Sequence, residues 1–214
     1  SIVVGDGKPA TITSGSACSG TEIYVLFTEA LLEVASRRFE FGDVAVDPQF
    51  ACDNDASRRE FILHQFPRLG ILVPDCMLFK SLKRTSSVTS VFGSMPNLVT
   101  GTPCRMPRVR LFCSGFSCKS VSLQSVFRNF SAGLKGSKGS TSVTYRAAWE
   151  VALAKRPFYI FLEHVKGLSK SDRKNVEDFE RLGYTMVVVE SDGKKHCLNQ
   201  RSVYECGSLV RFNH

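Results

Sequence analysis

The chain has 214 residues, of which 43% are hydrophobic, and it carries a net charge of +8. This is enough apolar content for one sizeable core, and the length fits one domain. No apolar run reaches the roughly 18–20 residues of a membrane span, and the N-terminal segment lacks the pattern of a signal peptide. The excess of Lys and Arg suits a polyanion such as nucleic acid, and equally a solvated basic surface.

The eight cysteines are scattered and form no C-x-x-C pair. This spacing argues against a disulfide framework and against a metal site, so we expect no bound metal. Free thiols indicate a reducing compartment, the nucleus of a eukaryote or otherwise the cytoplasm, and not secretion.

Strand and helix patterns alternate along the first half of the chain. Periodic apolar positions predict helices over 23–38 and 56–66, the second with Asp55 as its N-cap. Strands are predicted at 11–18 and 50–52, and residues 71–79 are predicted to form a third strand and a turn. Residues 84–107 are rich in Ser, Thr, Pro and Gly and are predicted to be a long connection.

The same alternation continues to the C-terminus. Apolar runs predict strands at 109–116, 157–165, 184–191 and 201–212. Helices are predicted at 143–154 and 170–182. The Gly/Ser-rich segment 131–143 carries two lysines and is predicted to be a mobile basic loop.

This order predicts an α/β fold, a Rossmann-like, doubly wound and mostly parallel sheet in a single domain over 1–214. Ligands bind such sheets at the carboxyl ends of the strands. The candidate functional side chains all follow predicted strands: Asp53, Asp75, Cys118 and Glu163. Their convergence is the main indication of one active site.

Two parts of this edge have recognisable chemistry. The small-residue turn Ser19-Gly20-Thr21 would let backbone amides approach a ligand, and Asp53 could bind ribose hydroxyls or merely cap a helix. Cys118 follows a buried strand at a turn, where a thiol is exposed and can act as a nucleophile. Glu163 ends an apolar strand, a position that suits a proton donor or a buried structural carboxyl.

The order of these segments resembles the catalytic domain of cytosine-5 DNA methyltransferases over nearly the whole chain. GFSCKSVS resembles the nucleophile motif Gly-Phe-Pro-Cys-Gln-x-x-Ser, and LEHVKGL resembles the Glu-Asn-Val motif. SACSGTEI and FACDND resemble the two cofactor motifs, and NQRSVY resembles the late Pro-Gln-x-Arg-x-Arg motif.

The resemblance implies methyl transfer from S-adenosyl-L-methionine to carbon 5 of cytosine, with Cys118 as the covalent nucleophile. Glu163 would hold the ring nitrogen and Arg201 the base carbonyl oxygen. The target base would leave the duplex. The implied cofactor-binding residues are Cys18, Ser19, Gly20, Thr21, Asp53, Asn54, Asp75, Cys76 and Ser114. The implied nucleic-acid contacts are Lys119, Ser122, Lys135 and Lys138.

Several positions depart from the family pattern. Ser117 replaces the Pro before the nucleophile, and Lys119 replaces the Gln after it. His164 replaces the Asn of Glu-Asn-Val. The chain ends where the family continues into a target-recognition domain, so we expect a fragment whose recognition part comes from a missing segment or another chain. Two alternatives stay open, a degenerate fold that binds cofactor or nucleic acid without turnover and an RNA cytosine-5 methyltransferase. A nicotinamide dehydrogenase is disfavoured, because no G-x-G-x-x-G follows the first strand.

Overall fold

The computed structural model describes residues 10–20, 23–40, 42–81, 95–117, 140–165, 177–192 and 205–210. The strands are β1 (Ala10–Ala17), β2 (Val44–Cys52), β3 (Ile71–Val73), β4 (Met95–Pro96), β5 (Pro103–Cys104), β6 (Leu111–Ser114), β7 (Tyr159–Val165), β8 (Val187–Asp192) and β9 (Glu205–Val210). The helices are α1 (Ile23–Phe39), α2 (Ala56–Gln65), the 3₁₀ helix η2 (Cys76–Ser81), α4 (Ser140–Lys155) and α6 (Glu177–Arg181).

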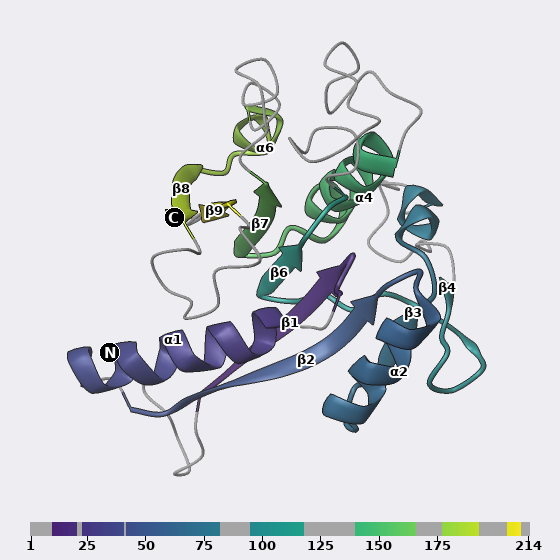
Figure 1. Cartoon of the computed structure of the whole chain (residues 1–214), viewed down its shortest axis with the longest axis horizontal. Helices are drawn as coiled ribbons and strands as arrows, with labels where there is room; N and C mark the ends of the chain where they lie inside the picture. Colours follow the sequence, from purple (N-terminus) through teal and green to yellow (C-terminus); the bar gives the residue numbers. More distant parts are fainter. Residues whose placement is uncertain are drawn as a thin grey trace.

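The main sheet has seven strands in the order β3-β2-β1-β6-β7-β9-β8. Strands β3, β2, β1, β6 and β7 pair in parallel, and β9 pairs antiparallel with both β7 and β8. The chain builds outward from β1 to β3 and then returns to place β6 on the other side of β1 (Figure 1). This reversal makes the carboxyl ends of β1 and β6 the topological switch point, where doubly wound sheets bind ligands. The predicted Rossmann-like fold is confirmed.

Helices cover both faces of the sheet (Figure 1). The larger core lies on the face of α4, η2 and α6, and it includes the buried rings of Phe50, Phe79 and Phe112. On the opposite face α2 buries Ile62 against Ala51, Leu69 and Leu72. Helix α1 lies over the neighbouring strands of that face, and five of its apolar side chains are more than half exposed: Leu26, Phe27, Leu31, Val34 and Phe39.

An irregularity in β2 sets which face receives Phe50. Ser14 pairs with Pro48, whereas Gly15 pairs with Phe50, so Gln49 has no partner across β1. One extra residue turns every later side chain to the other face, which directs Phe50 into the larger core. Proline is tolerated inside a sheet at such a bulge. The Phe50 ring then covers Gly15, where an added Cβ would lie 2.1 Å from a ring carbon.

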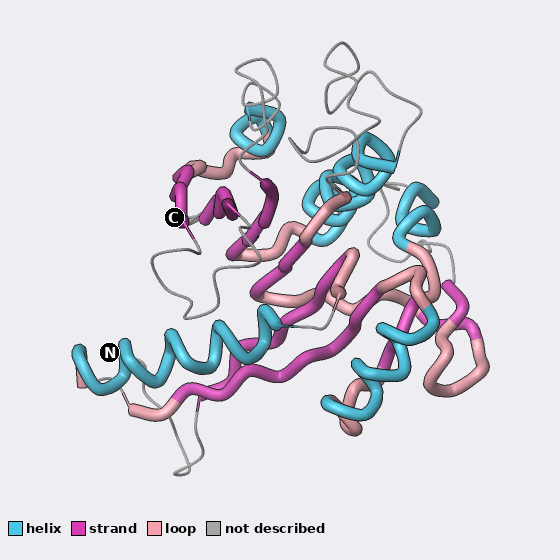
Figure 2. The backbone as a smooth tube through the Cα atoms, viewed as in Figure 1, coloured by secondary structure: helices cyan, strands magenta, loops and turns pink. Residues whose placement is uncertain are grey.

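Most predicted elements are confirmed, although several begin at other residues than predicted (Figure 2). Asp55 caps α2 as predicted, because its side chain accepts a hydrogen bond from the Arg58 amide at 3.1 Å. Helix α4 begins at Ser140, so residues 140–143 are its first turn and their prediction as loop is wrong. Strand β2 begins at Val44, six residues earlier than predicted.

Two other predicted segments are only partly covered by the described residues. The predicted connection at 84–107 contains the small β4–β5 hairpin. Of the predicted helix at 170–182, the described part is α6, and residues 170–176 lie outside the described ranges. None of the helices in the described ranges has the length and apolar content to cross a membrane.

The contact between Gly15 and Phe50 predicts a stability effect. Gly15→Ala should lower the free energy of unfolding by about 1–3 kcal/mol, because the new methyl group must displace a fully buried ring. Gly70→Ala is the matched control, since its Cβ would have no atom nearer than 4.0 Å. Urea denaturation of both variants measures the difference. Equal losses for the two would contradict the packing role of Gly15.

Candidate cofactor and active site

The turn after β1 is held open by two residues in the left-handed region. Cys18 has φ 55° and Gly20 has φ 59°. Glycine adopts this conformation without steric cost, whereas Cys18 is a non-glycine residue held there by its surroundings. An added Cβ at Gly20 would meet no atom of the described residues within 4 Å. The turn lies at the switch point of the sheet.

Asp53 fastens this turn to the end of β2. Its Oδ2 accepts a hydrogen bond from the Gly20 amide at 2.8 Å, and its Oδ1 accepts one from the Asp55 amide at 2.9 Å. The Arg58 guanidinium lies 3.8 Å from the same Oδ2. Asp53 is buried, so these hydrogen bonds compensate the cost of removing its charge from water. The carboxylate therefore shapes the turn directly, a role that the sequence did not reveal.

Hydrogen bonds between the β1 and β2 segments continue past the last residue of β1, through Ser19. Its amide donates to the Cys52 carbonyl at 2.9 Å, and its hydroxyl accepts from the Cys52 amide at 2.9 Å. The same Oγ lies 2.5 Å from Ser16 Oγ. Ser19 is buried, so its hydroxyl serves the turn rather than facing solvent. Asn54, by contrast, is exposed beside Asp53.

The end of β3 brings two more predicted residues to the same edge. Asp75 is half-buried, and Cys76 begins η2 directly after it. Cys18 Sγ donates to Cys76 Sγ across a distance of 3.6 Å, which joins the turn after β1 to the turn after β3. Contacts among the ends of β1, β2 and β3 thereby link six of the nine predicted cofactor residues: Cys18, Ser19, Gly20, Asp53, Asp75 and Cys76. The other three are Thr21, Asn54 and Ser114.

The chemical side of the site lies across the switch point, on β6 and β7. Ser114 pairs with Leu162, so Gly115 and Glu163 are neighbours at the carboxyl ends of these strands. A Cβ placed on Gly115 would lie 2.2 Å from the Tyr24 hydroxyl oxygen and 3.2 Å from Glu163 Oε2. Both polar groups therefore crowd the same point of the backbone, and a side chain at Gly115 would push them away.

Tyr24 is a residue that the sequence analysis missed. It lies in the first turn of α1, and its ring meets the Phe161 ring edge-on, with centroids 5.8 Å apart. This contact holds the phenol beside Glu163 at Gly115. Its sequence signal was weak, because a tyrosine in an apolar helix stripe is compatible with ordinary packing.

Helix α4 fixes the loop that leaves β6. The Ser117 amide donates to Thr144 Oγ1 at 2.9 Å, and the Thr144 hydroxyl donates to the Thr141 carbonyl at 3.1 Å. Phe116 is buried against the Tyr145 ring, with centroids 5.5 Å apart. The backbone is thus held up to Ser117, the residue before Cys118.

Ser114 carries the one observation in this region that points to a missing polar partner. Its side chain is fully buried, and within the described part of the chain its Oγ has no hydrogen-bond partner. Ser114 pairs with Ala17 of β1, so it lies at the switch point itself. An unsatisfied buried hydroxyl and the space that the described residues leave at Gly20 fit a polar, adenosine-type cofactor at this edge.

The remaining predicted site residues lie outside the described residues. They are Cys118, Arg201, Thr21, Lys119, Ser122, Lys135 and Lys138. Their roles stay predictions. Glu163 lies inside β7, and the structure places it beside the loop that leads to Cys118.

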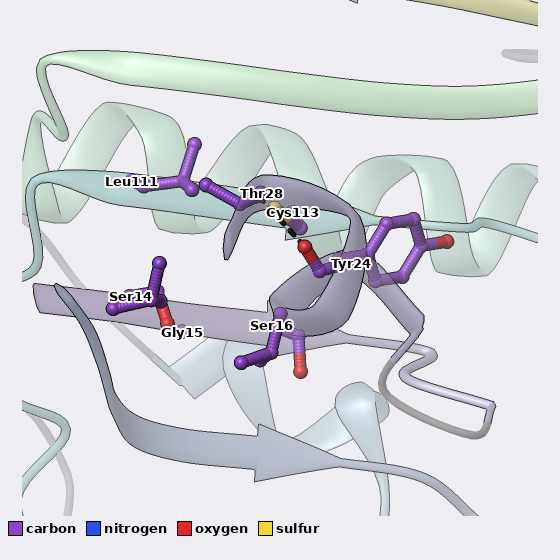
Figure 3. A pocket seen from close by; sticks show the side chains of 9 residues that line it. Ser14, Gly15, Ser16, Tyr24, Thr28, Leu111 and Cys113 are labelled. Atoms are coloured by element: carbon purple, nitrogen blue, oxygen red, sulfur yellow. Dashed lines mark hydrogen bonds between the residues drawn. The ribbon is translucent and has the colours of Figure 1, made fainter. Parts of the chain in front are cut away.

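A small cavity lies between α1 and strands β1, β2 and β6 (Figure 3). Its volume is about 10 Å³, close to what one water molecule needs. Ser14, Ser16, Thr28 and Cys113 line it, and the Thr28 hydroxyl donates to the Tyr24 carbonyl at 2.7 Å. The cavity separates α1 from the small residues of β1 and has no room for a cofactor.

Comparison with known proteins supports the fold. The sequence matches no family profile and no curated protein. A prophage protein of E. coli described as a DNA modification methyltransferase is structurally similar, with a TM-score of 0.54, 13% identity and 94% of this chain covered. The Dnmt2 methyltransferase of S. pombe gives a TM-score of 0.54, 14% identity and 95% coverage. This chain spans 47% and 50% of those two proteins. The chain therefore has the fold of these methyltransferases.

The crowding at Gly115 predicts a coupling between two positions. Gly115→Ala should lower the free energy of unfolding by about 1–3 kcal/mol, because its Cβ collides with the Tyr24 hydroxyl. In a Tyr24→Phe background the cost should shrink, since the nearest remaining Tyr24 atom is Cζ at 3.5 Å. A double-mutant cycle in urea measures this. Additive losses would contradict the arrangement.

Proposed function

We propose that this chain is the catalytic part of an S-adenosylmethionine-dependent cytosine-5 methyltransferase that acts on DNA. The observation that carries the proposal is the meeting of two groups at one sheet edge. The turn held by Asp53 follows β1, and Glu163 lies next to Gly115 on the other side of the switch point. This arrangement supports a cofactor site beside a carboxyl group that could contact the base, as methyl transfer between two bound molecules requires.

The cofactor would be held by the ends of β1, β2 and β3. The described residues leave space at the Gly20 turn, and Ser114 offers an unsatisfied hydroxyl. Asp53 keeps the turn in place, and the exposed Asn54 and half-buried Asp75 are available for polar contacts with the nucleoside. S-adenosylmethionine, when bound, supplies the activated methyl group. We assign ribose binding to the neighbourhood of Asp53, because both carboxylate oxygens already accept backbone amides.

Cys118 is the proposed nucleophile. Its thiolate would form a bond to carbon 6 of the cytosine, and the electrons of the carbon 5–carbon 6 double bond would shift towards carbon 5 and the ring nitrogen. Protonated Glu163 would hold that nitrogen and stabilise the negative charge that develops there. Carbon 5 can then accept the methyl group. Removal of its proton by a base restores the double bond and releases the Cys118 thiolate.

Contacts of the described residues support the proposed positions of Glu163 and Cys118. The Tyr24 hydroxyl and the Glu163 carboxyl both lie beside Gly115, and the Tyr24 ring packs edge-on against Phe161. On the other side Thr144 holds the Ser117 amide and so fixes the chain next to Cys118. Preorganised groups of this kind lower the cost of reaching the transition state.

The nucleic-acid partner is proposed from charge and from the likeness of fold. The net charge of +8 favours a polyanion. We favour DNA, because one similar structure is described as a DNA modification methyltransferase. The target base would be flipped out of the duplex to meet Cys118 and Glu163. Lys119, Ser122, Lys135 and Lys138 are proposed to contact the nucleic acid, and Arg201 the base carbonyl.

A binding measurement tests the cofactor site. Asp53→Ala should weaken S-adenosylmethionine binding by at least about tenfold, because the Gly20 turn loses its anchor. Asp47→Ala is the matched control, since Asp47 is an exposed acid of β2, the strand that precedes Asp53, and its carboxylate accepts a hydrogen bond from the Gln49 side chain. Isothermal titration calorimetry compares the two. Unchanged affinity in Asp53→Ala would reject the role of this turn.

Methyl transfer from labelled cofactor to DNA and to RNA tests the reaction. Glu163→Gln should lower kcat by about 10²–10⁴-fold, the range that general acid–base groups contribute. Glu177→Gln, an exposed carboxyl at the start of α6, should keep the wild-type rate. Transfer to RNA alone would replace DNA as the substrate. Failure with both nucleic acids, in a chain that binds the cofactor, would support the degenerate binding fold instead.

A further inference from the structure

Two cysteine thiols meet where the turns after β1 and β3 face each other across β2. Cys18 Sγ and Cys76 Sγ are 3.6 Å apart, although the residues are 58 positions apart in the sequence. Cys18 is half-buried, and Cys76 is 6% exposed. Both belong to the edge of the sheet that we assign to the cofactor. Both are among the residues that the family resemblance implies for cofactor binding, but neither thiol takes part in the proposed methyl-transfer steps.

The pair has an unequal affinity for protons. The hydrogen bond from Cys18 lowers the pKa of Cys76, against the opposing effect of burial. The same bond, together with burial, raises the pKa of Cys18. The lowered pKa favours Cys76 over Cys18 as the member that loses its proton, and Cys18 donates to it across 3.6 Å. A thiolate beside a second thiol is the arrangement from which disulfides form.

A third thiol is close but differs in character. Cys52 is fully buried in β2, and burial raises its pKa. It therefore stays protonated and acts as a small apolar side chain. Within the described ranges no group of three or more His, Cys, Asp and Glu side chains is arranged to hold a metal ion. The Cys18–Cys76 pair is thus best explained as a dithiol.

We propose that Cys18 and Cys76 form a peroxide-sensitive dithiol whose disulfide blocks the cofactor site. The consequence for the cofactor rests on the proposed function, whereas the chemistry of the pair does not. The modification would make methyl transfer depend on the redox state of its surroundings.

The oxidation proceeds in two balanced steps with hydrogen peroxide as the oxidant. The Cys76 thiolate attacks one peroxide oxygen, which breaks the O–O bond and leaves a sulfenic acid and hydroxide. The Cys18 sulfur then attacks the Cys76 sulfur, an S–S bond forms, and the sulfenic oxygen leaves as water with the thiol proton. Two electrons pass from the two sulfurs to the peroxide. A dithiol reductant reverses the reaction by thiol–disulfide exchange.

The disulfide would change the shape of the turn. The sulfur–sulfur distance must fall from 3.6 Å to the roughly 2.05 Å of an S–S bond. Cys18 has φ 55° and lies two residues before Gly20, whose amide is bonded to Asp53. A shift of Cys18 towards η2 therefore pulls on the Gly20–Asp53 bond. It also fixes the end of β3 to the turn, which removes the freedom needed to admit a nucleoside.

The test combines chemical mapping with a binding measurement. The reduced protein is treated with hydrogen peroxide, its free thiols are blocked with N-ethylmaleimide, and disulfide-linked peptides are mapped by mass spectrometry. We expect a Cys18–Cys76 cross-link that dithiothreitol removes. It should be absent in Cys18→Ser and in Cys76→Ser. Cys104→Ser is the control, because Cys104 lies in the β4–β5 hairpin and should leave the cross-link intact.

Calorimetry with S-adenosylmethionine then measures whether the disulfide weakens cofactor binding. Peroxide treatment should weaken binding at least about tenfold in wild type and in Cys104→Ser, and it should have no effect in Cys18→Ser. A cross-link that joins other cysteines, or none, would overturn the dithiol. A mapped Cys18–Cys76 disulfide with unchanged binding would overturn the block. Reduced protein that binds no cofactor would reject the proposed function and the block together, while the mapped disulfide would still establish the dithiol.

Discussion

The hydrogen bond between the Asp53 carboxylate and the Gly20 amide is the contact on which the candidate site depends. It joins the turn after β1 to the end of β2, and the second oxygen of Asp53 holds the Asp55 amide at the start of α2. Three elements therefore share one buried carboxylate. Because an unpaired buried charge is costly, loss of either partner would disturb all three. The conformation of the turn after β1 is therefore fixed by contacts within the chain itself.

Packing beneath this contact explains why the strand ends align. The bulge at Gln49 directs Phe50 over Gly15, whose partner on the other side is Phe112. Two residues further along, Ala17, Ser114 and Leu162 pair across β1, β6 and β7, and Gly115 and Glu163 directly follow the last two. Two glycines leave space for side chains of opposite character. Gly15 makes room for an apolar ring on the face of the larger core, and Gly115 makes room for a hydroxyl and a carboxylate. In the core and in the candidate site alike, a glycine leaves the space that a neighbouring side chain occupies.

The sequence predicted the fold well because apolar runs and helix periodicity are local signals. Strands β6 and β7, the cap at Asp55 and the edge shared by Asp53, Asp75 and Glu163 all followed from such patterns. The start of α4 was predicted too late, because Ser and Thr in its first turn look like loop residues. The roles of Tyr24 and Thr144 depend on tertiary contacts, which no local pattern encodes. For the same reason the anchoring bonds of Asp53 could not be distinguished from ligand binding.

We propose Cys118 as the nucleophile of a cytosine-5 methyltransferase, with Glu163 as its partner carboxyl. Covalent trapping on DNA that contains 5-fluorocytosine tests it most directly, because fluorine at carbon 5 cannot be removed as a proton and the enzyme stays attached. In the presence of S-adenosylmethionine the wild-type chain should form an adduct that survives denaturing electrophoresis, and Cys118→Ser should form none. An adduct that persists in Cys118→Ser, or no adduct in a wild-type chain that binds the cofactor and transfers methyl groups, would contradict the account.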